Sequence, residues 1–164
     1  MAKKKDEKTN VMRTLEQKKI PYTPHTYPHE EGVAVDGETV AALLGQDPAA
    51  VFKTLVTKGA SGGYYVFDIP VAESLDLKKA AKAVGEKSIA MLPAKELLPL
   101  TGYVHGGCSP VGMKKQFPTV FHESCLRQET MTVSAGKIGY QVTAKPADLI
   151  ALVRAGTADV IVTE

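Results

Sequence analysis

"AAVFKTLVTKGASGGYYVFDIPV", residues 49–71, is the stretch that decides the fold. Two runs rich in β-branched and aromatic residues flank a Ser-Gly-Gly turn at residues 61–63, which is the pattern of a β-hairpin. Because side chains alternate between the two faces of a strand, Val51, Lys53 and Leu55 share one face of the first run. The other face is also largely apolar, so we expect a hairpin that is covered on both sides.

Lys53 is the unusual residue of this hairpin, because its cation lies in mid-strand between two apolar neighbours. A buried lysine resists ionisation unless it is paired, and such lysines are frequent at functional sites. Two interpretations stay open on these grounds alone. Either Lys53 faces a ligand, or its side chain reaches water at the sheet edge or pairs with a carboxylate in the core.

The composition of the chain is that of one globular domain. The 164 residues are enough for a substantial core, and the hydrophobic content of 44% is ordinary for a folded protein. We expect a flexible basic tail at residues 1–8, where charged residues follow one another, and a single domain at residues 9–164.

Charge and hydropathy bear on where the protein works. The net charge of +2 does not by itself indicate nucleic-acid binding. The sequence shows neither the apolar core of a signal peptide nor an apolar run of the ~18 residues that a membrane-spanning helix needs. We therefore expect a cytoplasmic protein that does not associate with a membrane.

The remaining segments predict an α+β fold. Helices are expected at residues 10–19, 37–45, 75–85 and 145–156, the last capped by Gly156, with a helical turn at 94–98. Short apolar runs predict further strands at residues 22–31, 87–92, 102–107, 118–124, 130–136, 139–144 and 158–162. Hairpin-length connections outnumber helical crossovers, so the predicted architecture is a mixed, mostly antiparallel sheet surrounded by helices.

"HGGCSPVGMKK", residues 105–115, is the second unusual segment. Its glycines allow a backbone to approach a ligand closely and leave N–H groups free to donate to oxygen atoms. A purely structural turn would explain the same glycines. The segment matches neither a P-loop nor a dinucleotide-binding fingerprint.

The sequence gives little support to a protein nucleophile or a metal site. Cys108 lies between Gly107 and Ser109, but no base accompanies it in sequence, and with no C-x-x-C pair both cysteines are expected to be thiols. His25 and His29 lack the Cys or carboxylate partners that would complete a metal site. We therefore expect no bound metal.

Four segments together resemble one protein family. They are "VFKTLVTK", "LDLKKAAKAVG", "LTGYVHGGCSPVGMKK" and "VSAGKIGYQV", in that order. Over residues 11–162 the chain is similar to the YbaK/EbsC family, the freestanding relatives of the editing domain of bacterial prolyl-tRNA synthetases. The combination of the F-K-T-L strand with the G-G-x-S-P-x-G loop carries this resemblance. It implies the mixed sheet and helices of that editing domain, and no metal or organic cofactor.

The resemblance also implies a site. Lys53 takes the position of the family's essential lysine, which would anchor the terminal ribose or phosphate of a tRNA. The positions that match substrate-binding residues of the family are Tyr27, Asp36, Thr54, Gly106, Gly107, Ser109, Ser134, Gly136 and Gln141. Two of them depart from the family pattern, because Asp36 stands where an aromatic residue is found and Gln141 stands where an acidic one is found. These departures bear on which amino acid is preferred.

The implied activity is trans-editing, the hydrolysis of a mischarged Cys-tRNA(Pro). In this chemistry the cysteinyl thiol of the substrate attacks its own ester carbonyl and releases tRNA and a cyclic thiolactone. The protein would supply positioning and N–H donors around Gly106 and Gly107 for the oxyanion. The implied partners are the acceptor end of tRNA(Pro) and prolyl-tRNA synthetase. Two alternatives stay open: an Ala-tRNA(Pro) deacylase that uses bound water, and a non-catalytic module that binds an aminoacyl-tRNA end or a nucleotide.

Overall fold

The computed structural model describes residues 8–163 of the chain. The predicted flexible tail, residues 1–8, lies outside this range except for Lys8. The Lys8 ammonium forms an exposed ion pair with Glu16 at 2.9 Å. None of the helices within residues 8–163 has both the length and the apolar character needed to cross a membrane.

Five α-helices and eight strands make up the described part of the chain. The helices are α1 (Asn10–Gln17), α2 (Gly37–Leu44), α3 (Leu77–Val84), α4 (Ala94–Thr101) and α5 (Pro146–Val153). The strands are β1 (Thr23–Thr26), β2 (Phe52–Gly59), β3 (Tyr64–Pro70), β4 (Ile89–Met91), β5 (Thr119–His122), β6 (Met131–Ser134), β7 (Tyr140–Ala144) and β8 (Gly156–Ala158). Short 3-10 helices at Pro48–Ala50 and Glu123–Arg127 precede β2 and follow β5.

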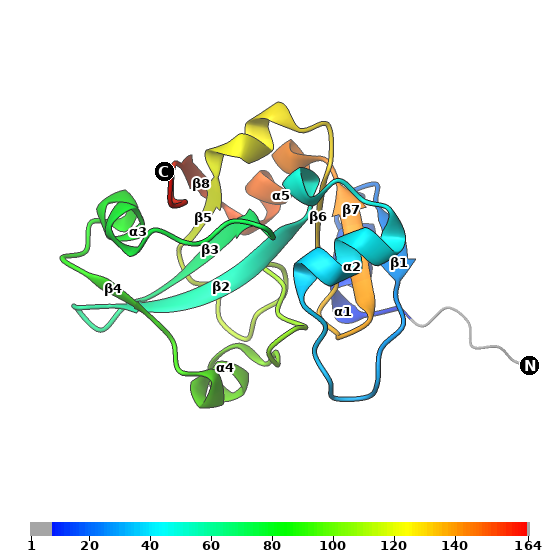
Figure 1. Cartoon of the computed structure of the whole chain (residues 1–164), viewed down its shortest axis with the longest axis horizontal. Helices are drawn as coiled ribbons and strands as arrows, with labels where there is room; N and C mark the ends of the chain where they lie inside the picture. The colour runs from blue at the N-terminus through cyan, green and yellow to red at the C-terminus, as the bar shows by residue number, and fades with distance from the viewer. Residues whose placement is uncertain (1–7, 164) are drawn as a thin grey trace, which may run out of the picture.

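The strands form two sheets that lie side by side (Figure 1). The three-stranded sheet has the order β1-β7-β6 and is antiparallel throughout. The five-stranded sheet has the order β4-β2-β3-β5-β8, in which the first two pairs are antiparallel and the last two are parallel. The predicted mixed, mostly antiparallel architecture is therefore confirmed. A single parallel bridge between Val51 and Thr132 joins the two sheets.

The hairpin β2–β3 forms the centre of the larger sheet, as predicted. Its turn closes where the Gly59 N–H donates to the Gly63 carbonyl at 2.7 Å. One face of the hairpin packs against α3, whose Ala80 and Ala81 contact a cluster that includes Phe67 of β3. This cover explains why both faces of the hairpin are apolar.

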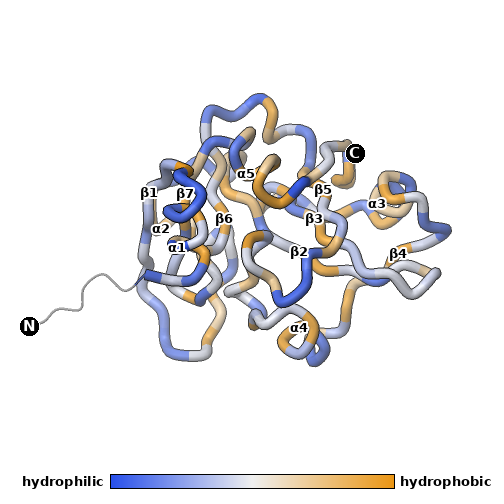
Figure 2. The backbone as a smooth tube through the Cα atoms, turned by 180° about the vertical axis from the view of Figure 1, so that it is seen from behind, coloured by the Kyte–Doolittle hydropathy of each residue, from blue (hydrophilic) through white to orange (hydrophobic). Residues whose placement is uncertain are grey.

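The main core lies on the opposite face of the hairpin, between it and the smaller sheet. It joins side chains from both sheets with those of α1 and α5, including Leu15, Phe52, Phe121, Met131 and Leu149. Figure 2 shows α5 as a largely hydrophobic segment, which is consistent with its role in closing this core. Burying apolar surface from α1, α5 and both sheets in one cluster fixes the two sheets relative to one another.

The predicted strand at residues 102–107 is wrong. Helix α4 extends to Thr101 and ends at Gly102, whose φ of 87° is left-handed. A turn follows, in which the Gly107 N–H donates to the Val104 carbonyl at 2.9 Å and Gly106 has a φ of 89°. Two glycines with positive φ bend the chain here, so the apolar residues between them do not form a strand.

The predicted end of the chain is displaced by a few residues. Helix α5 is capped by Arg154, with a φ of 57°, and not by Gly156. Gly156 instead begins β8, which pairs in parallel with β5 and ends at Ala158. Beyond it, Ile161 makes only an isolated bridge to Leu75. The strand expected at residues 158–162 therefore lies earlier in the chain, at Gly156–Ala158, where the backbone pairs in parallel with β5.

Candidate functional site

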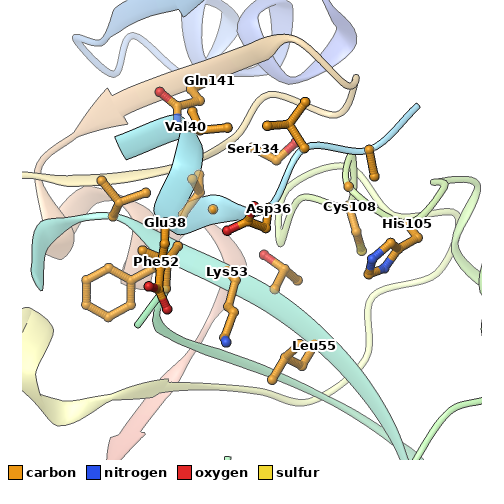
Figure 3. Close-up of a pocket in the computed structure, with 18 of the residues that line it drawn as sticks. Asp36, Glu38, Val40, Phe52, Lys53, Leu55, His105, Cys108, Ser134 and Gln141 are labelled. Carbon is orange, nitrogen blue, oxygen red and sulfur yellow. The ribbon is translucent and has the colours of Figure 1, made fainter. Parts of the chain in front are cut away.

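A pocket of about 660 Å³ lies where the two sheets meet, at the N-terminus of α2 (Figure 3). The five-stranded sheet contributes residues 52–55 of β2, and the three-stranded sheet contributes the end of β6 and the start of β7. The segment before α2 and the turn after α4 complete the lining. Of the residues expected at the site, seven line this pocket: Tyr27, Asp36, Lys53, Thr54, Gly106, Ser134 and Gln141.

Three expected residues do not line the pocket and instead shape its walls. Ser109 is fully buried, and its hydroxyl accepts a hydrogen bond from the Val111 N–H at 3.2 Å. The Gly136 N–H donates to the Ser134 hydroxyl at 3.1 Å, which closes the turn that follows β6. Gly107 packs against the backbone, since a Cβ there would lie 3.0 Å from the Ile138 nitrogen.

Lys53 extends into the pocket from β2, on the same side as Glu38 and Leu55 (Figure 3). The strand β4 pairs with β2 only from Thr57 onward, so the edge of β2 beside the pocket stays open at Lys53. The Lys53 side chain is half-buried and forms no hydrogen bond or ion pair with any residue in the range 8–163. Pairing with a core carboxylate, one of the interpretations left open by the sequence, is therefore not observed.

Two carboxylates stand at the first turn of α2, beside Lys53. Asp36 is the N-cap, and its oxygens accept hydrogen bonds from the Thr39 hydroxyl at 2.6 Å and from the Thr39 N–H at 3.2 Å. These hydrogen bonds lower the pKa of Asp36, which is therefore ionised at neutral pH. Glu38 lines the pocket as well and has no partner among the residues that the structure describes. The pocket thus presents one cation and two anions to a ligand.

Close packing and a left-handed backbone conformation both require glycine at position 106. Its φ is 89°, and a Cβ at this position would lie 2.6 Å from the Cβ of Ala34. The turn therefore touches the segment that leads into α2, and only glycine fits between them. The Gly107 N–H donates to the Val104 carbonyl, so of the two glycine N–H groups expected to stabilise an oxyanion only that of Gly106 lacks an acceptor among residues 8–163.

Cys108 also lines the pocket, but its thiol is a poor nucleophile. Burial raises the pKa of Cys108 to about 12, with the nearby Asp68 as a smaller cause. A thiol with this pKa is protonated at neutral pH, whereas the thiolate is the reactive form. That Cys108 is not the attacking group stays a prediction.

Gln141 and Tyr27 are contributed to the pocket by the three-stranded sheet and the residue that follows β1. Gln141 on β7 is buried, and its side-chain oxygen accepts a hydrogen bond from the Gln46 amide at 2.9 Å. Tyr27 follows β1 and is also buried, with its N–H donating to the Gly139 carbonyl at 3.0 Å. The Gln141 side chain and the Tyr27 backbone are thus held by the fold, which favours a preformed pocket.

Sequence reasoning missed one buried group beside the pocket. Asp68 on β3 lies directly across from Thr54, and its Oδ1 accepts a hydrogen bond from the Thr54 hydroxyl at 2.5 Å. Burial raises the pKa of Asp68 to about 7. The signal was present in the sequence, because "YYVFDIPV" places a single acid within an otherwise apolar strand.

The described part of the chain contains no cluster of side chains suited to bind a metal ion. No three His, Cys, Asp or Glu side chains within residues 8–163 are grouped so that they could hold a metal ion. The groups that the pocket offers include an ammonium, two carboxylates, several hydroxyls, an imidazole and an amide. These suit a ligand that carries both positive and negative groups.

Comparison with known proteins agrees with the motifs found in the sequence. The family model of the aminoacyl-tRNA editing domain matches residues 30–152. EbsC of Enterococcus faecalis, a proposed Cys-tRNA(Pro)/Cys-tRNA(Cys) deacylase, is 45% identical over the full length of both chains.

Solved structures show the same fold. The crystal structure of a proposed trans-editing enzyme for prolyl-tRNA synthetase matches with a TM-score of 0.78 and 26% identity over 94% of each chain. A hypothetical protein of known structure matches with a TM-score of 0.82 and 22% identity, covering 94% of this chain and 100% of its own. Given the family match and the full-length relative, the chain belongs to the aminoacyl-tRNA editing domain family.

Proposed function

We propose that this protein is a trans-editing deacylase that removes cysteine from mischarged Cys-tRNA(Pro). The observation that carries the proposal is the pocket at the junction of the two sheets, which joins Lys53 to Gly106 in a chain of the editing-domain family. The 45% identity to EbsC over the whole chain supports the cysteinyl substrate.

The charges of the pocket fit the two ends of an aminoacyl-adenosine. Lys53 carries a cation without an intramolecular partner among residues 8–163, so it is free to bind the phosphate or ribose of the terminal nucleotide. Glu38 carries an anion that is equally free, and it would bind the α-ammonium of the amino acid. A ligand that meets both groups is fixed in orientation as well as in position.

The proposed reaction uses the substrate's own thiol as the nucleophile. The thiol sulfur attacks the ester carbonyl carbon, the bond to the ribose oxygen breaks, and that oxygen takes up the proton that the thiol releases. The products are tRNA with a free terminal hydroxyl and a cyclic cysteine thiolactone. The protonated state of Cys108 supports this route, since the pocket holds no ready thiolate of its own. Gly106 is placed to donate its N–H to the oxyanion.

A thiol requirement would explain selectivity that pocket size cannot supply. One methylene changes the free energy of binding to an apolar pocket by only ~1–3 kcal/mol. Alanyl and prolyl esters lack a thiol, so they would bind without reacting by this route. The small net charge of +2 suits a domain that leaves recognition of the tRNA body to a partner. We propose prolyl-tRNA synthetase as that partner and the cytoplasm as the compartment.

The test is deacylation of Cys-, Ala- and Pro-charged tRNA(Pro) by the purified protein. We expect rapid loss of cysteine and little loss of proline. Lys53→Ala should abolish the activity, whereas Lys58→Ala, an exposed lysine on the same strand, should not change it. Preferential loss of alanine would indicate an alanyl deacylase instead, and binding without turnover would indicate a non-catalytic module.

A further inference from the structure

Asp68 is a buried carboxyl group that the proposed reaction does not use. Its side chain is 0% exposed, and only its Oδ1 is hydrogen bonded, to the Thr54 hydroxyl. Its Oδ2 has no hydrogen-bond partner within the described residues. A buried polar atom without a partner costs free energy, so a carboxyl group held in this way calls for a role beyond packing.

The surroundings of Asp68 do not neutralise a charge on it. Thr54 of β2 and Phe121 of β5 occupy the register positions on either side of it. Within residues 8–163 the titratable groups that interact with it are two thiols, and burial raises the pKa of Cys108 to about 12 and that of Cys125 to about 11. Both thiols are uncharged near neutral pH. Burial, opposed only by the Thr54 hydrogen bond, therefore raises the pKa of Asp68 to about 7.

Thr54 connects this carboxyl group to the pocket, because it lines the pocket and bonds to Asp68 at the same time. A hydroxyl group has one proton to donate and two lone pairs that accept. While Asp68 is ionised, it accepts a hydrogen bond from the Thr54 hydroxyl, and Thr54 offers a ligand only lone pairs. Once Asp68 is protonated, it can donate to Thr54, and the Thr54 proton is then free to turn into the pocket.

We propose that Asp68 is a positioning residue that, in its ionised form, orients the Thr54 hydroxyl as a hydrogen-bond acceptor for the aminoacyl-adenosine end of the substrate. The inference rests on the proposed function, because that substrate carries an α-ammonium group and a ribose hydroxyl as donors. Asp68 acts through Thr54 and does not touch the substrate. Protonation of Asp68 frees the Thr54 proton and occupies one of the Thr54 lone pairs, so the hydroxyl is no longer fixed as an acceptor.

The primary test compares wild-type protein with Asp68→Asn, which has nearly the same shape and does not titrate. The kcat/KM for Cys-tRNA(Pro) is measured from about pH 5.5 to about pH 8.5. Ionisations of the substrate are common to both proteins, so the ratio of wild-type to variant kcat/KM isolates the effect of Asp68. We expect this ratio to rise about tenfold with pH and to level off above neutrality. A ratio that is flat or falls with pH overturns the inference.

Changes at Thr54 test the relay with Asp68 itself left in place, although Thr54→Val also removes the hydrogen bond to its Oδ1. Thr54→Val should remove the contribution of Asp68 to the pH profile, while Thr54→Ser, which keeps the hydroxyl, should restore it. Thr57→Val is the matched control, since Thr57 is a buried threonine on the same strand that donates to the Tyr65 carbonyl and does not line the pocket. If Thr54→Val keeps the wild-type profile, Asp68 does not act through Thr54.

A binding measurement separates failure of this inference from failure of the proposed function. If the wild-type protein deacylates Cys-tRNA(Pro) and the ratio is flat, the inference fails and the proposed function stands. If the wild-type protein has no deacylase activity, the probe is amide-linked cysteinyl-adenosine, which cannot be hydrolysed. Its affinity should then rise with pH for the wild-type protein relative to Asp68→Asn, and equal pH dependence in both proteins overturns the inference.

Discussion

Gly106 and Ala34 hold two walls of the pocket in direct contact. A Cβ on Gly106 would lie 2.6 Å from the Ala34 Cβ, so the turn after α4 and the segment before α2 fit together only with glycine at this position. The contact places Gly106, whose N–H has no acceptor within the described residues 8–163, in the pocket that also contains Lys53. Residues far apart in the sequence thereby form a single site.

Gly106→Ala should destabilise the protein and impair deacylation together. The left-handed φ and the steric overlap with Ala34 should each cost ~1–3 kcal/mol in the free energy of unfolding. Gly62→Ala is the control, because Gly62 also has a positive φ of 97° but faces open space. Urea denaturation should show the larger loss at Gly106. Equal losses for the two variants would mean that the contact with Ala34 is unimportant.

Lys53→Ala should remove activity without reducing stability. The Lys53 ammonium has no partner within residues 8–163, so its removal breaks no interaction and relieves the cost of holding a charge beside apolar residues. We expect the free energy of unfolding to change by less than ~0.5 kcal/mol. Lys53→Arg should also be inactive, because a guanidinium group is larger and donates in a fixed fork. A large loss of stability in Lys53→Ala would show that the lysine has a structural role.

Removal of both cysteines should leave substantial turnover. The raised pKa values of Cys108 and Cys125 mean that neither thiol supplies a thiolate at neutral pH. The double variant Cys108→Ala with Cys125→Ala should therefore still deacylate Cys-tRNA(Pro), and mass spectrometry during turnover should find no acylated wild-type protein. An inactive but folded double variant, or a cysteinyl adduct on Cys108, would show that the protein provides the nucleophile.

The stability of the protein should depend on the ionisation of Asp68. Its pKa is raised from 3.8 to about 7, so the folded state binds a proton that the unfolded state has already lost between these values. Stability from this group is therefore fully present at low pH and is lost as pH rises toward 7. The free energy of unfolding of the wild-type protein minus that of Asp68→Asn should fall by on the order of 2–4 kcal/mol between about pH 4 and about pH 8.

Asp159→Asn should show the opposite pH dependence of the free energy of unfolding. Asp159 is exposed, and its hydrogen bond from Lys79 at 3.0 Å lowers its pKa. Its contribution is therefore present at neutral pH and lost on acidification. Denaturant titrations at several pH values check both variants. A difference between wild-type protein and Asp68→Asn that is independent of pH would contradict the buried, titrating carboxyl group.

Local sequence signals predicted the hairpin and most helix ends correctly. The Ser-Gly-Gly turn closes the hairpin, and the helices expected to end at residues 45 and 85 do end at Gly45 and Gly85, because each of these features depends on neighbours in sequence. The prediction of a strand around Val104 is wrong because this conformation depends on contacts that are distant in sequence. Two glycines with positive φ and packing against Ala34, which is distant in sequence, determine that conformation.

The candidate site was predicted in part, for a similar reason. The family resemblance supplied Lys53 and Gly106, and both line the pocket. It could not separate residues that face the pocket from those that hold its walls, such as Ser109, whose hydroxyl accepts the Val111 N–H. The pairing of Thr54 with Asp68 depends on the register of the hairpin, which alternating side chains alone do not fix.

The most direct test of the thiol-assisted mechanism compares two substrates that differ in one atom. The rates of deacylation of Cys-tRNA(Pro) and Ser-tRNA(Pro) by the wild-type protein are measured under the same conditions. We predict that the cysteinyl ester reacts at least ~100-fold faster, because a thiol is the better attacking group and the protein supplies no nucleophile of its own. Equal rates for the two esters would contradict the account and would show that water, or a side chain of the protein, attacks the ester.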